Sequence, residues 1–321
     1  SCVWSVLALG KKKFTGVSQF LARFRGWIQA GAALLTNLHL PNFLKGGLYQ
    51  GAGKTVCVPG LNCYSCPAAS GACPIGAFQA VVGSSKFSFS YYITGILILL
   101  GVLLGRFICG FLCPFGWFQE LLHKIPSRKL STRKLKPLRY LKYAILLVMV
   151  FLLPAFLVND VGMGDPFFCK YLCPQGVLEG AIPLSLANSG IRAALGSLFT
   201  WKLGILLVVI VLSVLFYRPF CKWLCPLGAF YALLNKVSLV QMKVDQSKCI
   251  SCGKCAKACK MDVDVTKSPN HTECIRCGMC VRACPTNAVR FRCGFGTGKQ
   301  GTVLPEKTNK QMNDIVKEKK S

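Results

Sequence analysis

The stretch Cys249-Ile-Ser-Cys252-Gly-Lys-Cys255-Ala-Lys-Ala-Cys259 decides the fold of the last third of this chain, and its spacing recurs at Cys274-Ile-Arg-Cys277-Gly-Met-Cys280-Val-Arg-Ala-Cys284-Pro285. Thiolates at this spacing bind [4Fe–4S] clusters, and in two-cluster domains the fourth cysteine of each run ligates the other cluster. We therefore expect two ligand sets: Cys249, Cys252, Cys255 and Cys284, and Cys274, Cys277, Cys280 and Cys259. A pair of all-cysteine zinc sites is the alternative, and two complete runs disfavour it.

Outside this stretch the chain is unusually apolar and unusually basic. Of its 321 residues, 53% are hydrophobic and 16% are charged, whereas a soluble domain carries about a quarter of charged residues. The 39 Lys and Arg against 11 Asp and Glu cluster beside the apolar runs, as in membrane proteins. The composition therefore predicts a lipid membrane as the partner of the basic residues, and no nucleic acid.

Four segments are candidates for crossing a bilayer, which takes about 20 helical residues. They are residues 26–44, 91–108, 140–158 and 201–217. The first contains Asn37 and His39, so a core helix is its alternative. The basic residues that precede the first span and those between the second and third predict that these regions face the cytoplasm. We therefore expect a multi-pass protein with both termini in the cytoplasm.

The membrane part contains an internal repeat. Arg106-Phe-Ile-Cys-Gly-Phe-Leu-Cys-Pro-Phe-Gly-Trp-Phe matches Arg218-Pro-Phe-Cys-Lys-Trp-Leu-Cys-Pro-Leu-Gly-Ala-Phe, and upstream Cys73-Pro-Ile-Gly matches Cys173-Pro-Gln-Gly at a similar distance. Two parallel copies of one unit would be related by an axis along the membrane normal. The sequence therefore predicts two tandem repeats, each with an outer and an inner cysteine element.

Outside the ferredoxin runs, the element Cys-x-x-x-Cys-Pro occurs in three places, namely Cys109/Cys113, Cys169/Cys173 and Cys221/Cys225. Residues four apart lie on one helix face, and the proline suits the first turn of a new helix, whose free N–H groups favour an anionic cluster. Four thiolates hold one cluster. We expect Cys109 and Cys113 to join Cys221 and Cys225 at the cytoplasmic edge, although small apolar packing is the alternative.

The fourth cysteine element, the loop 57–73, is less regular than the other three. Cys73 aligns with Cys173, so we expect it to join Cys169 and Cys173 in an outer cluster. Its partner is Cys66, Cys63 or Cys57, and we predict Cys66. The two cysteines left over are as open to a disulfide as to ligation, because the outside is oxidising.

These residues resemble the membrane polyferredoxin family, which includes the quinol-oxidising membrane subunit of periplasmic nitrate reductase systems and the C-terminal part of the nitrous-oxide reductase expression regulator. The resemblance covers residues 27–291 and rests on the Cys-x-x-x-Cys-Pro elements and on Cys259-Lys-Met-Asp-Val-Asp264. The chain departs by having three such elements and the loop 57–73. The resemblance implies electron transfer between a membrane or cytoplasmic donor and an extracytoplasmic acceptor.

The expected fold is an α-helical membrane protein, with about four transmembrane helices in two tandem repeats and a C-terminal α+β two-cluster bacterial ferredoxin domain. The expected boundaries are 1–25 for a cytoplasmic segment, 26–125 and 126–238 for the repeats, 239–293 for the ferredoxin domain and 294–321 for a basic disordered tail.

The expected function is electron transfer through four [4Fe–4S] clusters in a bacterial cytoplasmic membrane. A cytoplasmic ferredoxin or flavoprotein would donate to an extracytoplasmic acceptor, within a redox complex. The alternatives are a quinone-linked oxidoreductase subunit, a thiol–disulfide reductant that uses Cys57, Cys63 and Cys66, and a redox sensor. Whether the chain is itself an enzyme stays open.

Overall fold

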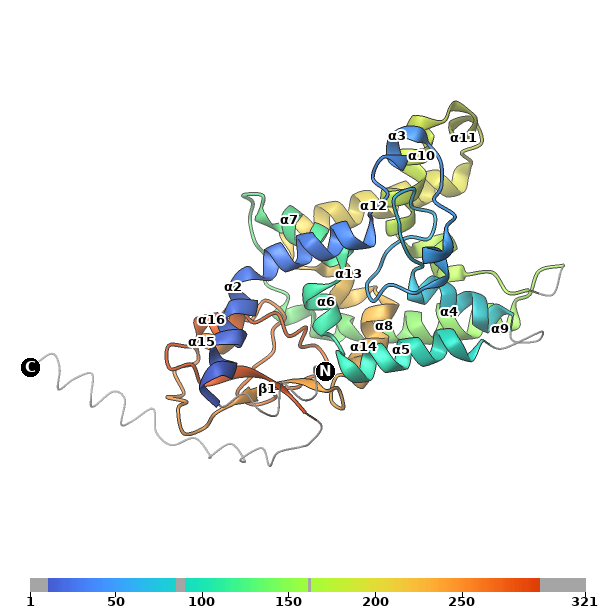
Figure 1. Cartoon of the computed structure of the whole chain (residues 1–321). Coiled ribbons are helices and arrows are strands. Elements are labelled where there is room, and N and C mark those ends of the chain that lie inside the picture. The colour runs from blue at the N-terminus through green and yellow to red at the C-terminus, as the bar shows by residue number, and fades with distance from the viewer. Residues whose placement is uncertain (1–10, 85–89, 161–162, 295–321) are drawn as a thin grey trace, which may run out of the picture.

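The computed structural model describes residues 11–84, 90–160 and 163–294 (Figure 1). The first ten residues of the predicted N-terminal segment and the predicted tail from residue 295 lie outside the described residues. In the first half the helical elements are α2 (Lys11–Thr36), α3 (Asn42–Lys45), η1 (Ala52–Thr55), α4 (Pro74–Gly83), α5 (Tyr91–Leu103), α6 (Phe107–Phe111) and α7 (Pro114–Lys124).

The second half continues the helical part and then changes to a small mixed region. The helical elements are η2 (Arg133–Tyr140), α8 (Leu141–Ile145), η3 (Leu146–Leu152), α9 (Leu153–Phe156), η4 (Phe168–Leu172), η5 (Gly176–Ala181), α10 (Ile182–Ala187), α11 (Ser189–Ala193), α12 (Ser197–Leu215), α13 (Pro219–Trp223) and α14 (Pro226–Leu234). The last elements are β1 (Val240–Val244), α15 (Lys254–Ala258), α16 (Met279–Ala283) and β2 (Val289–Cys293).

Within the described parts of the chain, two helices are long and apolar enough to cross a membrane, Leu135–Phe156 and Ser197–Leu215. They coincide with the third and fourth predicted spans. On α12 the side chains of Leu207, Val208 and Val211 are exposed, as is expected of a helix that faces lipid. The structure is therefore mostly helical with two candidate spans.

The first two predicted spans are wrong as continuous helices. Helix α2 ends at Thr36, where the Thr36 carbonyl accepts a hydrogen bond from the Ser70 amide at 2.9 Å instead of continuing the helix. Helix α5 has 13 residues, or about 20 Å at 1.5 Å per residue. The chain then turns at Gly105, whose φ of 55° favours glycine. Four spans are thus not confirmed.

The ferredoxin region is a two-stranded sheet with two short helices. Strands β1 and β2 pair antiparallel, from Val240 opposite Cys293 to Val244 opposite Val289. Figure 1 shows α2 running from this region to the helical part, and α2 contacts α16 and β2 at one end and α6 and α7 further along. The main hydrophobic core also includes Met261 and Ile275 of the ferredoxin region. The two parts are therefore packed into one body around the cysteines.

Candidate iron–sulfur sites

Four cysteines have the same local geometry, each in an extended conformation just before a proline. The φ angles are −70° at Cys73, −84° at Cys113, −74° at Cys173 and −74° at Cys225. At Cys73, Cys113 and Cys225 the cysteine is the N-cap and the proline begins α4, α7 or α14. Proline is preorganised for this position and needs no N–H there. That the two halves are copies of one unit stays a prediction.

A glycine three residues after each of these cysteines leaves room beside the thiol. The Gly228 amide donates to Cys225 Sγ at 3.3 Å, and a side chain at Gly76 would place its Cβ 3.7 Å from Cys169 Sγ. The first turn of each helix therefore presents an N–H group and empty space to the sulfur atoms, which suits an anionic cluster.

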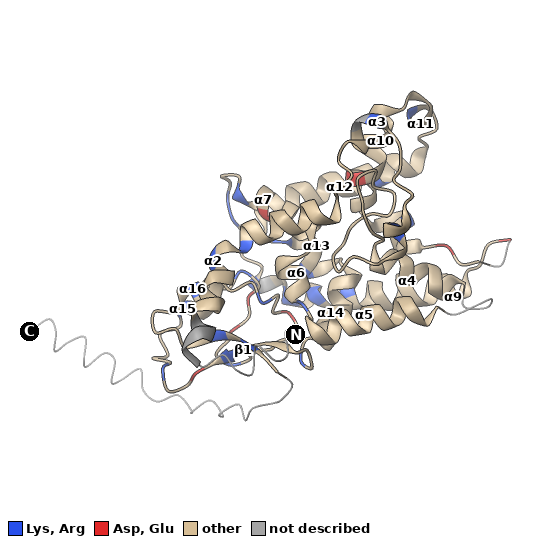
Figure 2. Ribbon diagram, in the orientation of Figure 1, with Lys and Arg blue, Asp and Glu red and all other residues tan. Residues whose placement is uncertain are grey.

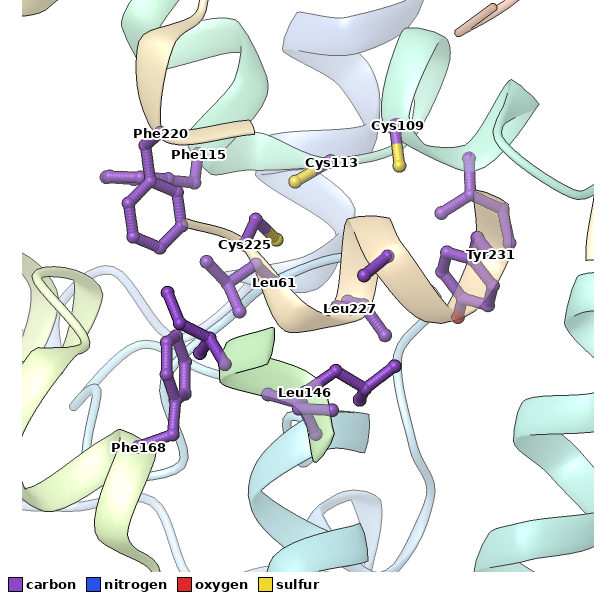
Figure 3. Packing of buried hydrophobic residues seen from close by; sticks show 14 of the residues in the cluster. Leu61, Cys109, Cys113, Phe115, Leu146, Phe168, Phe220, Cys225, Leu227 and Tyr231 are labelled. Carbon is purple, nitrogen blue, oxygen red and sulfur yellow. The ribbon is translucent and has the colours of Figure 1, made fainter. Parts of the chain in front are cut away.

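The first membrane site, which we call the inner site, consists of Cys109, Cys113, Cys221 and Cys225. All four line one small cavity of about 10 Å³. Figure 3 shows Cys109, Cys113 and Cys225 around a common space, with Leu61, Leu227 and Tyr231 nearby. The structure thus brings together the four cysteines that the sequence predicted for this site, from segments far apart in the chain.

Two buried arginines flank the inner site. Arg106 precedes α6 and Arg218 precedes α13, and neither side chain is exposed. Arg218 donates to the carbonyl oxygen of Cys109 and lies 2.9 Å from Glu120. Acidic residues are few over the whole ribbon (Figure 2). These cations favour the negative charge that thiolates and a cluster would bring into an apolar core.

The second membrane site, which we call the outer site, consists of Cys63, Cys73, Cys169 and Cys173. They line a larger cavity of about 520 Å³ together with Cys57, Lys54 and Lys202, among other residues. Lys202 donates to the Cys169 carbonyl at 3.0 Å. The structure therefore joins Cys73 to Cys169 and Cys173 as predicted.

The structure places Cys63, and not the predicted Cys66, at the outer site. Cys66 is fully buried among Ala68, Ala69 and Cys63, with its sulfur 3.6 Å from Asn37 Oδ1. Cys63 and Cys66 belong to one turn, in which the Cys66 amide bonds the Cys63 carbonyl at 3.1 Å, but only the Cys63 side chain of this pair lines the outer cavity. Within the described residues, Cys57 and Cys66 form no disulfide.

Two buried glutamines were missed by the sequence analysis. Gln79 Nε2 lies 3.1 Å from Cys169 Sγ, and Gln119 Nε2 lies 3.2 Å from Cys221 Sγ. Each glutamine also accepts from the amide before the cysteine it contacts, that of Phe168 at 3.0 Å or Phe220 at 3.2 Å. Each follows its Cys-Pro pair at the same spacing, and this shared offset was the signal that could have revealed them.

In the ferredoxin region both predicted sets come together. Cys249, Cys252, Cys255 and Cys284 line a small cavity of about 20 Å³. At the other set, burial and then the neighbouring Cys277, Cys274 and Cys259 raise the pKa of Cys280 well above its ordinary value. Gly253 and Gly278 have φ of 68° and 75° at the starts of α15 and α16. Glycine is favoured there because other residues are strained.

The second ferredoxin set lies directly against the inner site. A Cβ at Gly110 would be 2.3 Å from the Ile275 carbonyl oxygen and 3.7 Å from Cys277 Cα. Glu273 forms ion pairs with Arg106 at 2.9 Å and with Lys142 at 2.6 Å. Despite burial, these two cations lower the pKa of Glu273 to about 2. The ferredoxin loop is thus held against α6, the helix that carries Cys109.

The donor sets fit clusters better than single metal ions. Among residues 11–84, 90–160 and 163–294, no three His, Cys, Asp or Glu side chains converge closely enough to hold one ion. The inner site and the first ferredoxin site instead each gather four thiols around one small cavity. Four thiols gathered in this way are what a [4Fe–4S] cluster requires.

Two family models, each described as a 4Fe-4S binding domain, match this chain. One matches residues 71–92, 88–133, 142–182 and 198–245. Each of these segments contains one of the four Cys-Pro pairs. The other matches residues 242–263 and 268–290, which contain the two ferredoxin runs.

Similar curated proteins include three from different organisms. An uncharacterized protein of Methanocaldococcus jannaschii is 28% identical over 182 residues, 54% of this chain and 66% of that protein. The methylamine utilization ferredoxin-type protein MauN of Methylorubrum extorquens is 27% identical over 198 residues, 59% of this chain and 56% of its own. The ferredoxin-type protein NapH of Haemophilus influenzae is 27% identical over 179 residues, 55% of this chain and 54% of its own.

The matched segment of this chain therefore spans between 54% and 66% of the length of these relatives. No solved structure matches. The family models cover both the membrane Cys-Pro segments and the ferredoxin runs, and the relatives include ferredoxin-type proteins. This chain belongs to the membrane polyferredoxin family of 4Fe-4S binding proteins.

Proposed function

We propose that this chain passes electrons across a bacterial cytoplasmic membrane, between a cytoplasmic donor and an extracytoplasmic acceptor. Its membership in an iron–sulfur electron-transfer family supports electron transfer as the function. The observation that carries the rest is the inner site, where four thiols from two distant segments line one cavity beside the ferredoxin loop. A thiol arrangement of this kind has no evident use in packing alone.

The proposed ligands form four sets. They are Cys249, Cys252, Cys255 and Cys284; Cys259, Cys274, Cys277 and Cys280; Cys109, Cys113, Cys221 and Cys225; and Cys63, Cys73, Cys169 and Cys173. Cys63 replaces the predicted Cys66 because Cys63 lines the outer cavity and Cys66 does not. Cys57 lines it too, but a Cβ at Gly176, three residues after Cys173, would lie 3.7 Å from Cys63 Sγ. Each set would hold one [4Fe–4S] cluster, which supplies a one-electron couple.

The packing supports an order for these sets. The loop that carries Cys277 lies against Gly110, between Cys109 and Cys113, so the second ferredoxin set and the inner set are neighbours. Leu61 lines both the inner and the outer cavity, so these two sets are neighbours as well. The proposed order is the first ferredoxin set, the second ferredoxin set, the inner site and the outer site.

The surrounding residues prepare the membrane sites for charge. Arg106 and Arg218 bring permanent positive charge to the inner site, and Gln79 and Gln119 offer N–H donors to one cysteine of each site. Apolar side chains such as Leu61 and Leu227 exclude water from the inner site, which strengthens each of these electrostatic contacts.

The proposed partners follow from the direction of the chain of sites. A cytoplasmic ferredoxin or flavoprotein would donate at the ferredoxin region, and an outside flavoprotein, thioredoxin-like protein or reductase would accept at the outer site. The relatives named ferredoxin-type proteins are consistent with membership in a redox complex. Both termini would then face the cytoplasm.

The experiment that tests this proposal is the iron and acid-labile sulfide content per chain, measured anaerobically on the wild type and on Cys221→Ser/Cys225→Ser. Four clusters predict about sixteen irons, falling to about twelve in the variant. Cys66→Ser is the matched control and should leave the iron content unchanged. About eight irons in both proteins would confine the clusters to the ferredoxin region and overturn the proposal.

A second candidate function is a quinone-linked oxidoreductase subunit, and the outer cavity favours it. That cavity is about 520 Å³ against about 10 Å³ at the inner site, so it has room beyond a cluster. Part of its wall is apolar, with Ala77, Ala80 and Ile93. Quinol-dependent cluster reduction that Ala80→Phe abolishes and that the exposed control Ala193→Phe preserves would favour this candidate. If quinol does not reduce the clusters, the second candidate is excluded and only the first proposal stands.

A further inference from the structure

A further cavity, of about 200 Å³, lies where α2, α7 and the ferredoxin region meet. In Figure 1 the helix α2 passes beside both α7 and α16, and it contacts each of them. The cavity is lined in part by Gln29 of α2, Lys124 of α7 and Arg282 of α16. It is separate from the cysteine cavities of the two membrane sites, although Cys277 forms part of its wall.

Gln29 is the feature that points to a ligand. Its side chain is 1% exposed, and neither Nε2 nor Oε1 has a hydrogen-bond partner among the described residues. A buried amide with both ends unpaired is costly, and native proteins rarely leave one in that state. A ligand that fills the cavity must therefore offer an acceptor to Nε2 and a donor to Oε1.

The charges around the cavity indicate the sign of that ligand. Arg25 is committed to Glu120 and to the Gly110 carbonyl at 2.9 Å. Arg23, Lys124 and Arg282 also line the cavity, and none of them forms an ion pair in the described structure. Three uncompensated cations beside a buried amide favour an anion, and phosphate matches arginine and lysine donors well.

The exposed face of α2 indicates where such an anion comes from. Phe20, Phe24 and Trp27 are 58%, 38% and 78% exposed, and their spacing puts them on one side of the helix. Exposed aromatic side chains of this kind lie at the membrane–water interface. Basic cavities at that depth bind the head groups of anionic lipids.

We propose that this cavity binds the phosphate of an anionic phospholipid whose head group also carries a hydroxyl. Gln29 Nε2 donates to a phosphate oxygen and Gln29 Oε1 accepts from the hydroxyl, while Arg23, Lys124 and Arg282 balance the charge. Because Cys277 lines the same cavity, the head group lies against the ferredoxin loop. The chain thereby recognises the lipid composition of its membrane beside a redox site.

The test uses the full chain in nanodiscs of phosphatidylcholine with or without phosphatidylglycerol, with native mass spectrometry counting the lipids that stay bound. The variants are Gln29→Leu and Arg23→Gln/Arg282→Gln, and Arg192→Gln is the control because Arg192 is exposed outside the cavity. Phosphatidylglycerol retention should fall about tenfold in Gln29→Leu, as the loss of one hydrogen bond to a charged group predicts. Iron content, unchanged across all variants, reports that each has folded.

A second arm separates the sources of phosphate. Equilibrium dialysis with inorganic phosphate in phosphatidylcholine nanodiscs measures binding of the free anion. Binding of phosphatidylglycerol without binding of inorganic phosphate supports the lipid as the ligand of the cavity. Saturable phosphate binding that Arg23→Gln/Arg282→Gln abolishes supports the same cavity but overturns the lipid as its source. Equal retention of phosphatidylglycerol in Gln29→Leu, or equal loss in Arg192→Gln, overturns the site. These outcomes do not depend on the number of clusters.

Discussion

The inner and outer sites use the same corner, a cysteine followed by proline and a helix, but they close to different degrees. At the inner site each half contributes one cysteine on a short helix and one at the corner that follows it, Cys109/Cys113 and Cys221/Cys225, around one small cavity. At the outer site Cys73 follows directly on a loop, and the fourth thiol comes from Cys63 in that loop. That cavity is about 520 Å³.

This difference indicates that one scaffold serves two tasks. A closed site tied to the ferredoxin loop suits passage of electrons within the molecule, because nothing else needs to enter it. An open site with two lysines, Lys54 and Lys202, suits exchange with a partner or small molecule. The loop supplies that opening, since a loop can change length without disturbing the helices that hold the other thiols.

The largest expected effect separates Cys63 from Cys66. Cys63→Ser should lower the iron content by about four per chain, because a cluster needs four thiolates, whereas Cys66→Ser should lower it by none. Anaerobic iron and sulfide assays check this. The reverse result would restore the sequence-based assignment of Cys66 and would mean that the outer loop rearranges around its cluster.

The next effect concerns the ion pairs of Glu273, which bind the ferredoxin loop to the inner site and not to the outer site. Glu273→Gln leaves Arg106 and Lys142 buried without their carboxylate, and this should cost about 3–5 kcal/mol. Guanidinium titrations that follow cluster absorbance measure it. Asp245→Asn is the control, because its pair with Arg290 at 3.8 Å is more exposed and should contribute about 0–1 kcal/mol.

The same carboxylate predicts a pH dependence. The pKa of Glu273 is lowered from 4.5 to about 2 in the folded chain, because Arg106 and Lys142 outweigh the effect of burial. A lowered pKa stabilises the fold at pH values above the unfolded value. The stability difference between wild type and Glu273→Gln should therefore be full above about pH 4.5 and shrink towards pH 2. A difference that grows on acidification would contradict this assignment.

A smaller effect tests the contact between a buried glutamine and a cysteine sulfur, which the two sites share. Gln79→Leu and Gln119→Leu each remove one N–H donor to a cysteine sulfur. Such donors raise cluster potentials, so the outer or inner midpoint should fall by about 40 mV, equivalent to about 1 kcal/mol for one hydrogen bond. Redox titrations followed by electron paramagnetic resonance measure both. Equal shifts would confirm the shared geometry, and no shift would show that the contacts are structural only.

The smallest effect is expected from a second substitution that should not restore the lost iron. Ala69 stands before Cys73 at the spacing at which Cys109 stands before Cys113. Ala69→Cys should not restore iron to Cys63→Ser, because residue 69 lies in a loop and not on a helical turn that aligns thiols four apart. Recovery of about four irons would show that the outer site can adopt the inner geometry.

The sequence predicted some of these features well and others poorly. Short-range spacing was sufficient for the two ferredoxin sets and for the helices that start after Cys-Pro, because those geometries are local. The spans at 26–44 and 91–108 were wrong as continuous helices, since apolar composition does not reveal where tertiary contacts end a helix. Gln79 and Gln119 looked like ordinary polar residues on amphipathic helices.

By itself, the sequence determined that this chain holds thiols in sets of four beside apolar helices. Cysteine spacing and proline fix backbone direction within one or two turns, so those statements need no distant contact. Only the tertiary structure decided which thiols from separate segments share a cavity. How loops and helices pack decides that Cys63 rather than Cys66 lines the outer cavity, and that Ile275 contacts Gly110. Such packing is a property of the whole fold, and no local pattern contains it.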